Sequence, residues 1–476
     1  MADILITHSY FLRFDAKQWT NQQPYAPLAT LYVASVLRNA ACNISFYDVM
    51  FNETVAEMEV AFIKEKPKVF VICDDGFNYL TKMCLTNMRD AAFEMIALAK
   101  KYGCKVIISS SDSTDHSEEY LKRGADFIVV GEAEQTMLEL VKTINNNETD
   151  FTNINGLRFL ANQELVKTAK RENLKDLDTL PMPAWDLINI QNYKNRWLAK
   201  KGYFSINMGT TRGCPFKCNW CAKPIYGQRY NSRSPQNVVN EIKYLQQQFG
   251  INHIWFCDDI FGLKPSWANE FADILNRENM SIKFKIQSRV DLLLEENNIA
   301  ALAQAGCDEA WVGAESGSQK ILDAMDKGTQ VEQIYEATLL MKSKGIKPCF
   351  FLQFGYLNET YADIELTLKM VFDLMPHDVG ISVSYPLPGT KFYDKVKDQL
   401  KEKTNWTDSD ELAMMFKSTF PGEFYKKLQR YVHSEYRKRM ALQAWKQHKN
   451  FKKAISLVYR YPQTFISKAV LNKYVH

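Results

Sequence analysis

Short apolar runs alternate with segments of helical spacing through most of the 476-residue sequence. In residues 1–150 the apolar runs are DILITHS, NISFYDV, KVFVICDD, KVIISSS and DFIVVGEAE, with helical stretches such as LATLYVASVLRNAA between them. A parallel strand is reached from its neighbour by a crossover connection, which is usually a helix, so this alternation predicts a parallel sheet. We therefore expect an α/β fold whose first domain is a doubly wound parallel sheet.

A second alternation runs from about residue 203 to residue 396 and contains six strand–helix units. Six units are too few for a closed eight-stranded barrel, so we expect a Rossmann-like domain at 1–150 to be followed by a partial (β/α)6 barrel at 196–400. Residues 151–195, rich in Leu, Asp and Pro, are expected to form an ordered linker, and residues 401–476 a helical C-terminal region. Ligands of both kinds of sheet bind at the carboxyl ends of the strands.

The composition is that of a globular protein, with 46% hydrophobic and 24% charged residues. The sequence contains no run of about 18 apolar residues that would span a membrane, and its first residues, MADILITHSYFLRF, lack the basic segment of a signal peptide. Apart from one cluster, the ten cysteines are scattered, which does not indicate a disulfide framework. We expect a cytoplasmic protein with reduced thiols.

The clustered cysteines are Cys214, Cys218 and Cys221 in the segment TRGCPFKCNWCAKP, with the spacing C-x3-C-x2-C. Thiolates suit soft metals and iron–sulfur clusters, and a 4Fe–4S cluster usually takes four cysteines. Three cysteines would leave one iron with an open coordination position. A structural zinc ion is the alternative, but it needs a fourth ligand, and His253 and Cys257 are candidates without a paired motif. We interpret the three cysteines as the ligands of a 4Fe–4S cluster.

This segment, the strand before it and the six strand–helix units resemble the radical S-adenosylmethionine (SAM) superfamily. In that family the open iron binds the amino and carboxylate groups of SAM, and one electron from the cluster cleaves SAM to a 5′-deoxyadenosyl radical that abstracts hydrogen from a substrate. The resemblance implies that an electron donor of flavodoxin or ferredoxin type is a partner. It also implies SAM-binding roles for six residues: Trp220 beside the adenine, Asp258 and Asp259 near the methionine amine, Arg289 facing a carboxylate, and Glu315 and Ser316 near the ribose or methionine. The segment FGYLNET departs from the turn that relatives carry at this place.

A doubly wound domain before such a barrel resembles the cobalamin-binding radical SAM enzymes, which include the anaerobic magnesium-protoporphyrin ester cyclases and the hopanoid methylases. Relatives carry Gly-Gly and a His after the fourth strand, whereas this sequence has Ser109-Ser110 and places Asp112 where the His would align. We therefore expect no histidine ligand on cobalt. The resemblance implies that cobalamin binds to Asp74, Ser109, Ser110, Thr114, Gly131 and Glu132. A domain that has lost cobalamin is the alternative.

Cobalamin and SAM together favour C-methylation of a small-molecule or lipid-like substrate, with the methyl group taken from methylcobalamin. Two alternatives stay open. One is a radical SAM cyclase or rearrangement enzyme of the same architecture, with or without cobalamin. The other is a non-catalytic protein that binds an iron–sulfur cluster or cobalamin.

Residues 421–476 carry 13 Lys and Arg but 2 Asp and Glu, a local charge of +11. Basic and aromatic residues at helical spacing predict either a helical cap with a solvated basic face or a peripheral contact with an anionic membrane surface or substrate. No nucleic-acid motif is present, so we expect no nucleic-acid partner. The methylthiotransferases that modify transfer RNA carry three further clustered cysteines in the N-terminal domain. The cysteines of that domain lack such spacing here: Cys42, Cys73, Cys84 and Cys104.

Overall fold

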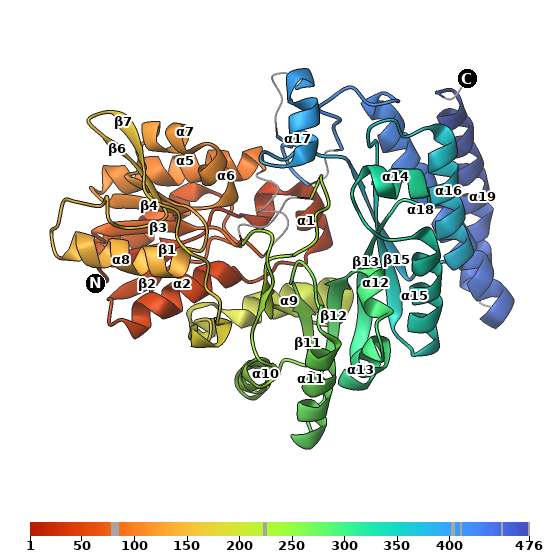
Figure 1. The fold of residues 1–476 in the computed structure, drawn as a ribbon, viewed down its shortest axis with the longest axis horizontal. Helices are drawn as coiled ribbons and strands as arrows, with labels where there is room; N and C mark the ends of the chain where they lie inside the picture. The colour runs from red at the N-terminus through yellow and green to blue at the C-terminus, as the bar shows by residue number, and fades with distance from the viewer. Residues whose placement is uncertain (78–84, 222–225, 401–404, 410–411, 449–450, 475–476) are drawn as a thin grey trace.

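The computed structural model describes residues 1–77, 85–221, 226–400, 405–409, 412–448 and 451–474. It contains two α/β domains side by side and a pair of long helices at the C-terminal end (Figure 1). The predicted α/β fold, with a Rossmann-like domain, a six-stranded partial barrel and a helical C-terminal region, is confirmed. Cys84 lies outside the described residues.

The N-terminal sheet has seven strands in the order β2-β1-β3-β4-β5-β6-β7. The first five of these are parallel: β2 (Ile44–Phe46), β1 (Ile4–Thr7), β3 (Val69–Cys73), β4 (Lys105–Ser109) and β5 (Phe127–Val129). Helices α2 (Leu28–Asn39) and α8 (Ala133–Asn145) pack on one face, and α3 (Glu59–Glu65), α5 (Thr86–Lys101) and α7 (Ser117–Lys122) pack on the other. The strand order reverses between β1 and β3, and ligands of such sheets bind at that point.

Residues 151–195, expected as a linker, add two strands to this sheet. The strands β6 (Leu157–Ala161) and β7 (Glu164–Lys167) form an antiparallel hairpin that pairs with β5. The turn residues Asn162 and Gln163 have φ of 51° and 69°. Two-residue hairpin turns of this type need positive φ at both positions, and Asn adopts that conformation more readily than most residues. The short period-2 pattern of this hairpin is a weak sequence signal beside the longer parallel strands.

The barrel sheet has six strands, and each strand pairs with the next one in chain order. These strands are β8 (Ile206–Met208), β11 (His253–Phe256), β12 (Lys283–Ser288), β13 (Cys307–Glu315), β14 (Lys347–Phe354) and β15 (Asp378–Val383), all parallel. The longest helix of each interval between them is α10 (Pro235–Phe249), α11 (Pro265–Arg277), α13 (Asn298–Ala305), α15 (Val331–Ser343) or α16 (Tyr361–Leu374), and the short helices α12 (Val290–Leu293) and α14 (Gln319–Ala324) also lie in these intervals. Strands β8 and β15 are the two edges and do not pair with each other among the described residues, so the barrel is open.

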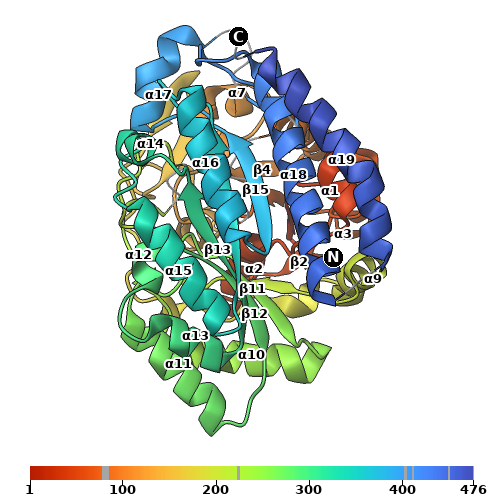
Figure 2. The same ribbon diagram turned by 90° about the vertical axis from the view of Figure 1, so that its right-hand side faces the viewer.

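The C-terminal helices cover the β15 edge of the barrel. Helix α18 (Gly422–His448) packs against β15 and α16, and α19 (Phe451–Asn472) runs beside α18 (Figure 2). Phe424, Leu428 and Val432 of α18 are buried, and the Tyr436 hydroxyl donates to the backbone oxygen of His377 at 2.8 Å. In the described part of the chain, no helix combines the length and apolar character needed to cross a membrane.

Candidate active site

The cysteine loop leaves the barrel at the carboxyl end of β8. It is bracketed by a short antiparallel pair, β9 (Thr211–Arg212) and β10 (Asn231–Ser232). Gly213 directly before the first cysteine has φ of 87°, and a Cβ at this position would lie 2.4 Å from the backbone oxygen of Arg229. Only glycine fits this close approach, so Gly213 fixes the direction in which the loop starts.

The three thiols of the loop lie near one another. Cys218 is buried, Cys214 and Cys221 are partly buried, and electrostatic interactions link all three. Burial is the main cause that raises the pKa of Cys214 and raises the pKa of Cys221 to about 12, and Asp259 and the other thiols act in the same direction. Metal ligation requires thiolates, so these thiols must release protons when a metal cluster binds.

The described residues contain no group of three His, Cys, Asp or Glu side chains that converges on the position of a single metal ion. A 4Fe–4S cluster makes a different demand, because each cysteine ligates its own iron and the sulfurs do not meet at one ion. The donor set of three neighbouring thiols at the barrel mouth fits such a cluster.

Arg289, at the carboxyl end of β12, lies beside this loop. Its Nη1 is 3.8 Å from the Cys218 Sγ and donates to the backbone oxygen of Lys327 at 2.8 Å. Its other nitrogens pair with both Asp291 carboxylate oxygens at 3.0 and 2.8 Å, and its guanidinium carbon lies 3.7 Å from the centroid of the Phe216 ring. These contacts hold a permanent positive charge next to one cluster thiol.

Lys327, which the sequence reasoning did not single out, adds a second positive charge. Its ammonium donates to the Glu315 Oε1 at 2.9 Å, and both side chains are buried. Electrostatic interactions connect Lys327 with Cys218 and Cys221. Glu315 adopts φ of 55° at the end of β13, an unusual conformation for a residue other than glycine. The Lys327 side chain follows α14 (Gln319–Ala324), and only the folded chain reveals its pairing with Glu315.

Ser316, the residue after Glu315, makes hydrogen bonds that stabilise the local fold. The Ser316 Oγ lies 3.0 Å from the Thr367 Oγ1 and accepts a hydrogen bond from the Ser318 backbone at 3.1 Å. Ser316 therefore fixes the turn after β13 and connects it with α16.

The two adjacent aspartates after β11 lie in different environments. The carboxylate of Asp258 is fully buried and accepts from the backbone nitrogens of Thr210 and Thr211 at 2.6 and 2.8 Å. Burial is the main cause that raises the pKa of Asp258 to about 6. Asp259 is more exposed and acts electrostatically on Cys214 and Cys221. Asp258 thus anchors the start of the cysteine loop, and Asp259 is the carboxylate near the thiols.

Trp220 and Asn219, within the cysteine loop, connect it to the rest of the barrel mouth. The Asn219 side chain donates to the Ala324 backbone oxygen at 2.8 Å and accepts from the Tyr356 hydroxyl at 2.8 Å. Trp220 packs against an apolar cluster that includes Tyr356 and Phe392, and its buried Nε1 has no hydrogen-bond partner among the described residues. Tyr356 belongs to the segment FGYLNET, so the departure from the family turn gives the loop a contact with the cysteine segment.

The second ligand edge is the carboxyl end of the N-terminal sheet. At its switch point, the Asp74 carboxylate accepts from the Ser9 backbone and hydroxyl at 2.7 and 2.9 Å. Ser109 is buried at the end of β4, and the Ser110 hydroxyl caps α6 (Ser111–Asp115) by accepting from the Ser113 backbone at 2.9 Å. The Thr114 hydroxyl donates to the backbone oxygen of Ser110 at 2.9 Å. These hydroxyls fix the loop after β4, and Gly131, with φ of 85° and no atom within 4 Å of a Cβ position, leaves space beside it.

Asp112, which we expected at the place of the relatives' histidine, is held in a largely buried ion pair with Arg89. Arg89 donates to both of its oxygens at 2.7 and 2.5 Å, and the Tyr120 hydroxyl donates at 2.8 Å. His116 lies 3.9 Å from Asp112, and burial lowers its pKa. Both carboxylate oxygens of Asp112 therefore already have partners.

The two ligand edges are joined by a buried cluster of charged residues. Arg212 of β9 is 2% exposed and pairs with Glu132 at 2.9 Å and with both oxygens of Glu134, which follow β5 in the other domain. Glu132 also pairs with Arg229 at 2.7 Å and accepts from the Leu174 backbone at 2.6 Å. Glu132 thus holds the domains together, a role that sequence spacing did not reveal.

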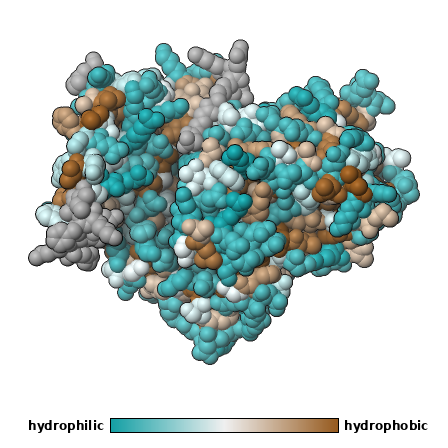
Figure 3. Space-filling view, turned by 180° about the vertical axis from the view of Figure 1, so that it is seen from behind, coloured by the Kyte–Doolittle hydropathy of each residue, from teal (hydrophilic) through white to brown (hydrophobic). Residues whose placement is uncertain are grey.

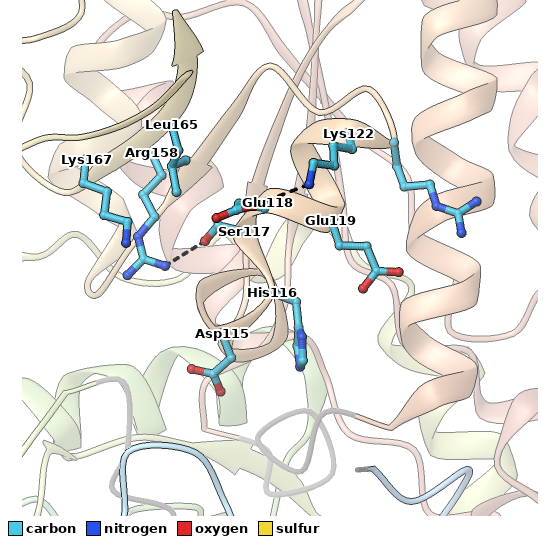
Figure 4. Close-up of a pocket in the computed structure, with 10 residues that line it drawn as sticks. Asp115, His116, Ser117, Glu118, Glu119, Lys122, Arg158, Leu165 and Lys167 are labelled. Atoms are coloured by element: carbon cyan, nitrogen blue, oxygen red, sulfur yellow. Dashed lines mark hydrogen bonds and ion pairs between the residues drawn. The ribbon is translucent and has the colours of Figure 1, made fainter. Parts of the chain in front are cut away.

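A separate hollow of about 590 Å³ lies on the N-terminal domain between α7 and the β6–β7 hairpin (Figure 4). Asp115 and His116 lie on one side, and Arg158 is directed toward Ser117, to which it donates at 2.7 Å. Burial raises the pKa of Asp115 to about 6. The residues that line the hollow begin at Asp115, directly after the loop of Ser109, Ser110 and Asp112 in the sequence. They include both acidic and basic side chains.

Residues 208–371 match the Radical SAM superfamily model, and the chain is a radical SAM enzyme. It is 27% identical to an uncharacterized methyltransferase of Pyrococcus horikoshii over 80% of each chain. It is 29% identical to an anaerobic magnesium-protoporphyrin IX monomethyl ester cyclase of Cereibacter sphaeroides, over 58% of this chain and 45% of the cyclase. Members of the superfamily use a 4Fe–4S cluster and SAM, and they need a reductant.

Its fold is also that of the cobalamin-dependent SAM radical enzyme OxsB, solved with aqua-cobalamin bound. The two structures superpose with a TM-score of 0.73 and 17% identity, over 98% of this chain and 72% of OxsB. At this identity the likeness concerns the fold, and it extends through the N-terminal domain, the barrel and the C-terminal helices.

Proposed function

We propose that this protein is a cobalamin-dependent radical SAM enzyme that methylates a carbon atom of a small molecule. The observation that carries the proposal is the ion-pair cluster of Arg212 with Glu132 and Glu134, because it joins the base of the cysteine loop to the ligand edge of the Rossmann-like domain. Two cofactors bound at these edges would face one another across the barrel mouth. The methyltransferase relative from Pyrococcus horikoshii supports methyl transfer, and OxsB supports cobalamin.

In this proposal Cys214, Cys218 and Cys221 hold the 4Fe–4S cluster, which supplies the electron that cleaves SAM. Arg289 and Lys327 stabilise the negative charge of the thiolates, because both cations are held nearby in a low-dielectric environment. The remaining residues would position SAM: Trp220 for the adenine, Asp259 for the ammonium, and Glu315 for the ribose. Asp258 and Ser316 act one step further away, since their hydrogen bonds fix the loops that carry these groups.

Cobalamin, when bound, supplies the methyl group. Asp74, Ser109, Ser110, Thr114 and Gly131 would form its cradle, in which small side chains let the cofactor approach the backbone. Glu132 would support that cradle through the Arg212 contact. Because Arg89 and Tyr120 occupy the Asp112 carboxylate, no side chain at this position would ligate cobalt.

The test is anaerobic reconstitution with iron and sulfide, followed by incubation with SAM, a reductant and cobalamin. The enzyme should form 5′-deoxyadenosine, and Cys218→Ala should abolish its formation, whereas Cys104→Ala in the N-terminal core should not. Metabolites of a deletion strain that lack one methyl group would then identify the substrate. Wild-type enzyme that takes up iron but cannot cleave SAM would overturn the proposal.

The second candidate is cyclisation or rearrangement, which the similarity to the ester cyclase favours. SAM with a deuterated methyl group separates the two candidates. Methyl transfer carries the label into the product, whereas cyclisation leaves the product unlabelled.

The C-terminal helices also support a peripheral contact of this cytoplasmic protein with an anionic membrane surface. Val458, Tyr459, Phe465 and Ile466 of α19 are exposed beside basic residues, and apolar atoms lie among hydrophilic ones on this side of the molecule (Figure 3). Sedimentation with anionic and with neutral vesicles tests the contact. Equal amounts of pelleted protein would contradict it.

A further inference from the structure

The inner face of the barrel carries an aromatic floor with one lysine. Along β11 to β15, alternate residues join the core under the outer helices, for example Phe284 and Ile286. Side chains of a strand alternate between its two faces, so the intervening residues face the barrel lumen. The lumen-facing residues along these strands include Trp255, Lys285, Glu309, Trp311, Phe351 and Gly380.

Part of this floor is exposed on the β13–β15 side. Phe351 lies in the middle of β14 and is nevertheless 37% exposed. Parallel sheets are normally covered on both faces, so an exposed phenylalanine inside one marks a face that the described residues do not fill. The ring centroids of Trp311 and Phe351 are 4.8 Å apart, and a side chain at Gly380 would contact both rings. The two rings pack against each other with an interplanar angle of 31° and form one apolar surface.

Lys285 borders this surface and makes no hydrogen bond or ion pair in the described part of the chain, although Glu309 lies opposite it in the β12–β13 register and acts on it electrostatically. It is 8% exposed, and its Nζ lies 5.2, 5.5 and 6.0 Å from the ring centroids of Trp255, Trp197 and Tyr25. Burial lowers its pKa to about 8, while Glu309 and Cys349 act in the opposite direction and Lys201 in the same one. Lysine is rarely buried without a partner, because removing its charge from water costs several kcal/mol.

A purely structural role does not explain this lysine. Contacts with aromatic faces contribute about 2 kcal/mol when desolvated, less than the cost of burying the charge, and a Met or Leu would fill the same space without that cost. An anionic group of the substrate would offset this cost, because it would pair with the Lys285 ammonium when the substrate binds.

We propose that Lys285 and the aromatic floor bind the substrate of this enzyme, a molecule with a flat apolar body and an anionic group. The anion pairs with the Lys285 ammonium, and the flat body lies on Trp311 and Phe351. Arg289 is four residues further along β12, roughly 13 Å away at the rise of a strand, and it contacts the cysteine loop. The opposite end of such a molecule therefore points toward the cluster. This inference rests on the proposed function only in placing the substrate in the barrel.

The test uses two fluorescent probes with nearly the same rings, the anionic 8-anilinonaphthalene-1-sulfonate and the neutral N-phenyl-1-naphthylamine. Both are titrated into the reconstituted full-length protein. Lys285→Met should weaken binding of the anionic probe by roughly tenfold or more, as loss of a hydrogen bond to a charged group does. Binding of the neutral probe should change less than about twofold, and Lys285→Arg should restore the anionic probe.

Lys283→Met is the matched control, because Lys283 is on the same strand but exposed, and it should leave both affinities unchanged. Phe351→Ala should weaken both probes. Equal affinity of wild type and Lys285→Met for the anionic probe would overturn the proposal. So would a parallel loss of both probes in Lys285→Met, which would show that the lysine only supports the floor. The assay needs no turnover, so a wild-type enzyme unable to cleave SAM would overturn the proposed function without obscuring this result.

Discussion

Replacing Arg212 with Gln removes the cation that joins the two ligand edges. Glu132 keeps Arg229 and the Leu174 backbone as partners, whereas Glu134 loses the partner of both its oxygens and stays buried. Breaking a buried ion pair by removing one member costs about 3–5 kcal/mol, because an uncompensated charge remains in a low-dielectric environment. We expect Arg212→Gln to destabilise the protein by that amount.

The corresponding change in melting temperature is modest because the chain is long. At the usual entropy of unfolding per residue, 476 residues unfold with roughly 1 kcal/mol per kelvin. If the two domains unfold together, 3–5 kcal/mol lowers Tm by roughly 3–5 °C. The control is Arg38→Gln. Arg38 pairs with Asp186 at 2.6 and 2.9 Å, but the two side chains are 42% and 52% exposed, and such pairs contribute less than about 1 kcal/mol.

Calorimetry of four proteins measures the effect: wild type, Arg212→Gln, Glu134→Gln and the double variant. The double variant should be more stable than Arg212→Gln, since it carries no unpaired Glu134 carboxylate. A double variant no more stable than Arg212→Gln, or a loss of Tm equal to that of Arg38→Gln, would refute the reasoning.

Two further predictions concern the loop after β14. Burial raises the pKa of Glu359 to about 8 from 4.5, so between these values the unfolded state is ionised while the folded state stays neutral, and stability falls as pH rises. Glu359→Gln does not titrate, so its free energy of unfolding should rise relative to that of wild type from pH 5 to pH 8, by up to about 1.4 kcal/mol per pH unit. Tm measured across this range follows the change, and a constant difference in Tm would contradict the prediction. Tyr356→Phe removes the hydrogen bond to Asn219 and should speed proteolysis within the cysteine loop at unchanged Tm; protection equal to that of wild type would show that Trp220 packing suffices.

Local signals in the sequence predicted the elements of the fold well. Ser234, Pro235 and Gly250 mark the ends of α10 in the sequence, and in the structure Ser234 accepts from the Asn237 backbone while Gly250 adopts φ of 63°. The barrel strands and their order followed from the alternation of apolar runs. The β6–β7 hairpin did not, because a short exposed hairpin has little hydrophobic pattern and depends on its turn conformation and on the β5 edge.

The roles of the site residues depend on contacts between distant segments, which spacing alone does not encode. Asp258 and Asp259 are equivalent in sequence, yet a strand places one carboxylate under the Thr210 backbone and leaves the other near the thiols. The pairing of buried charges helps to assign some of these roles. A buried cation must find an anion, and in this structure Arg212, Arg289 and Lys327 all find one within the chain, whereas Lys285 does not. Because these three buried cations form ion pairs, a buried lysine without one is informative, and in our proposal it marks where the molecule that completes the site binds.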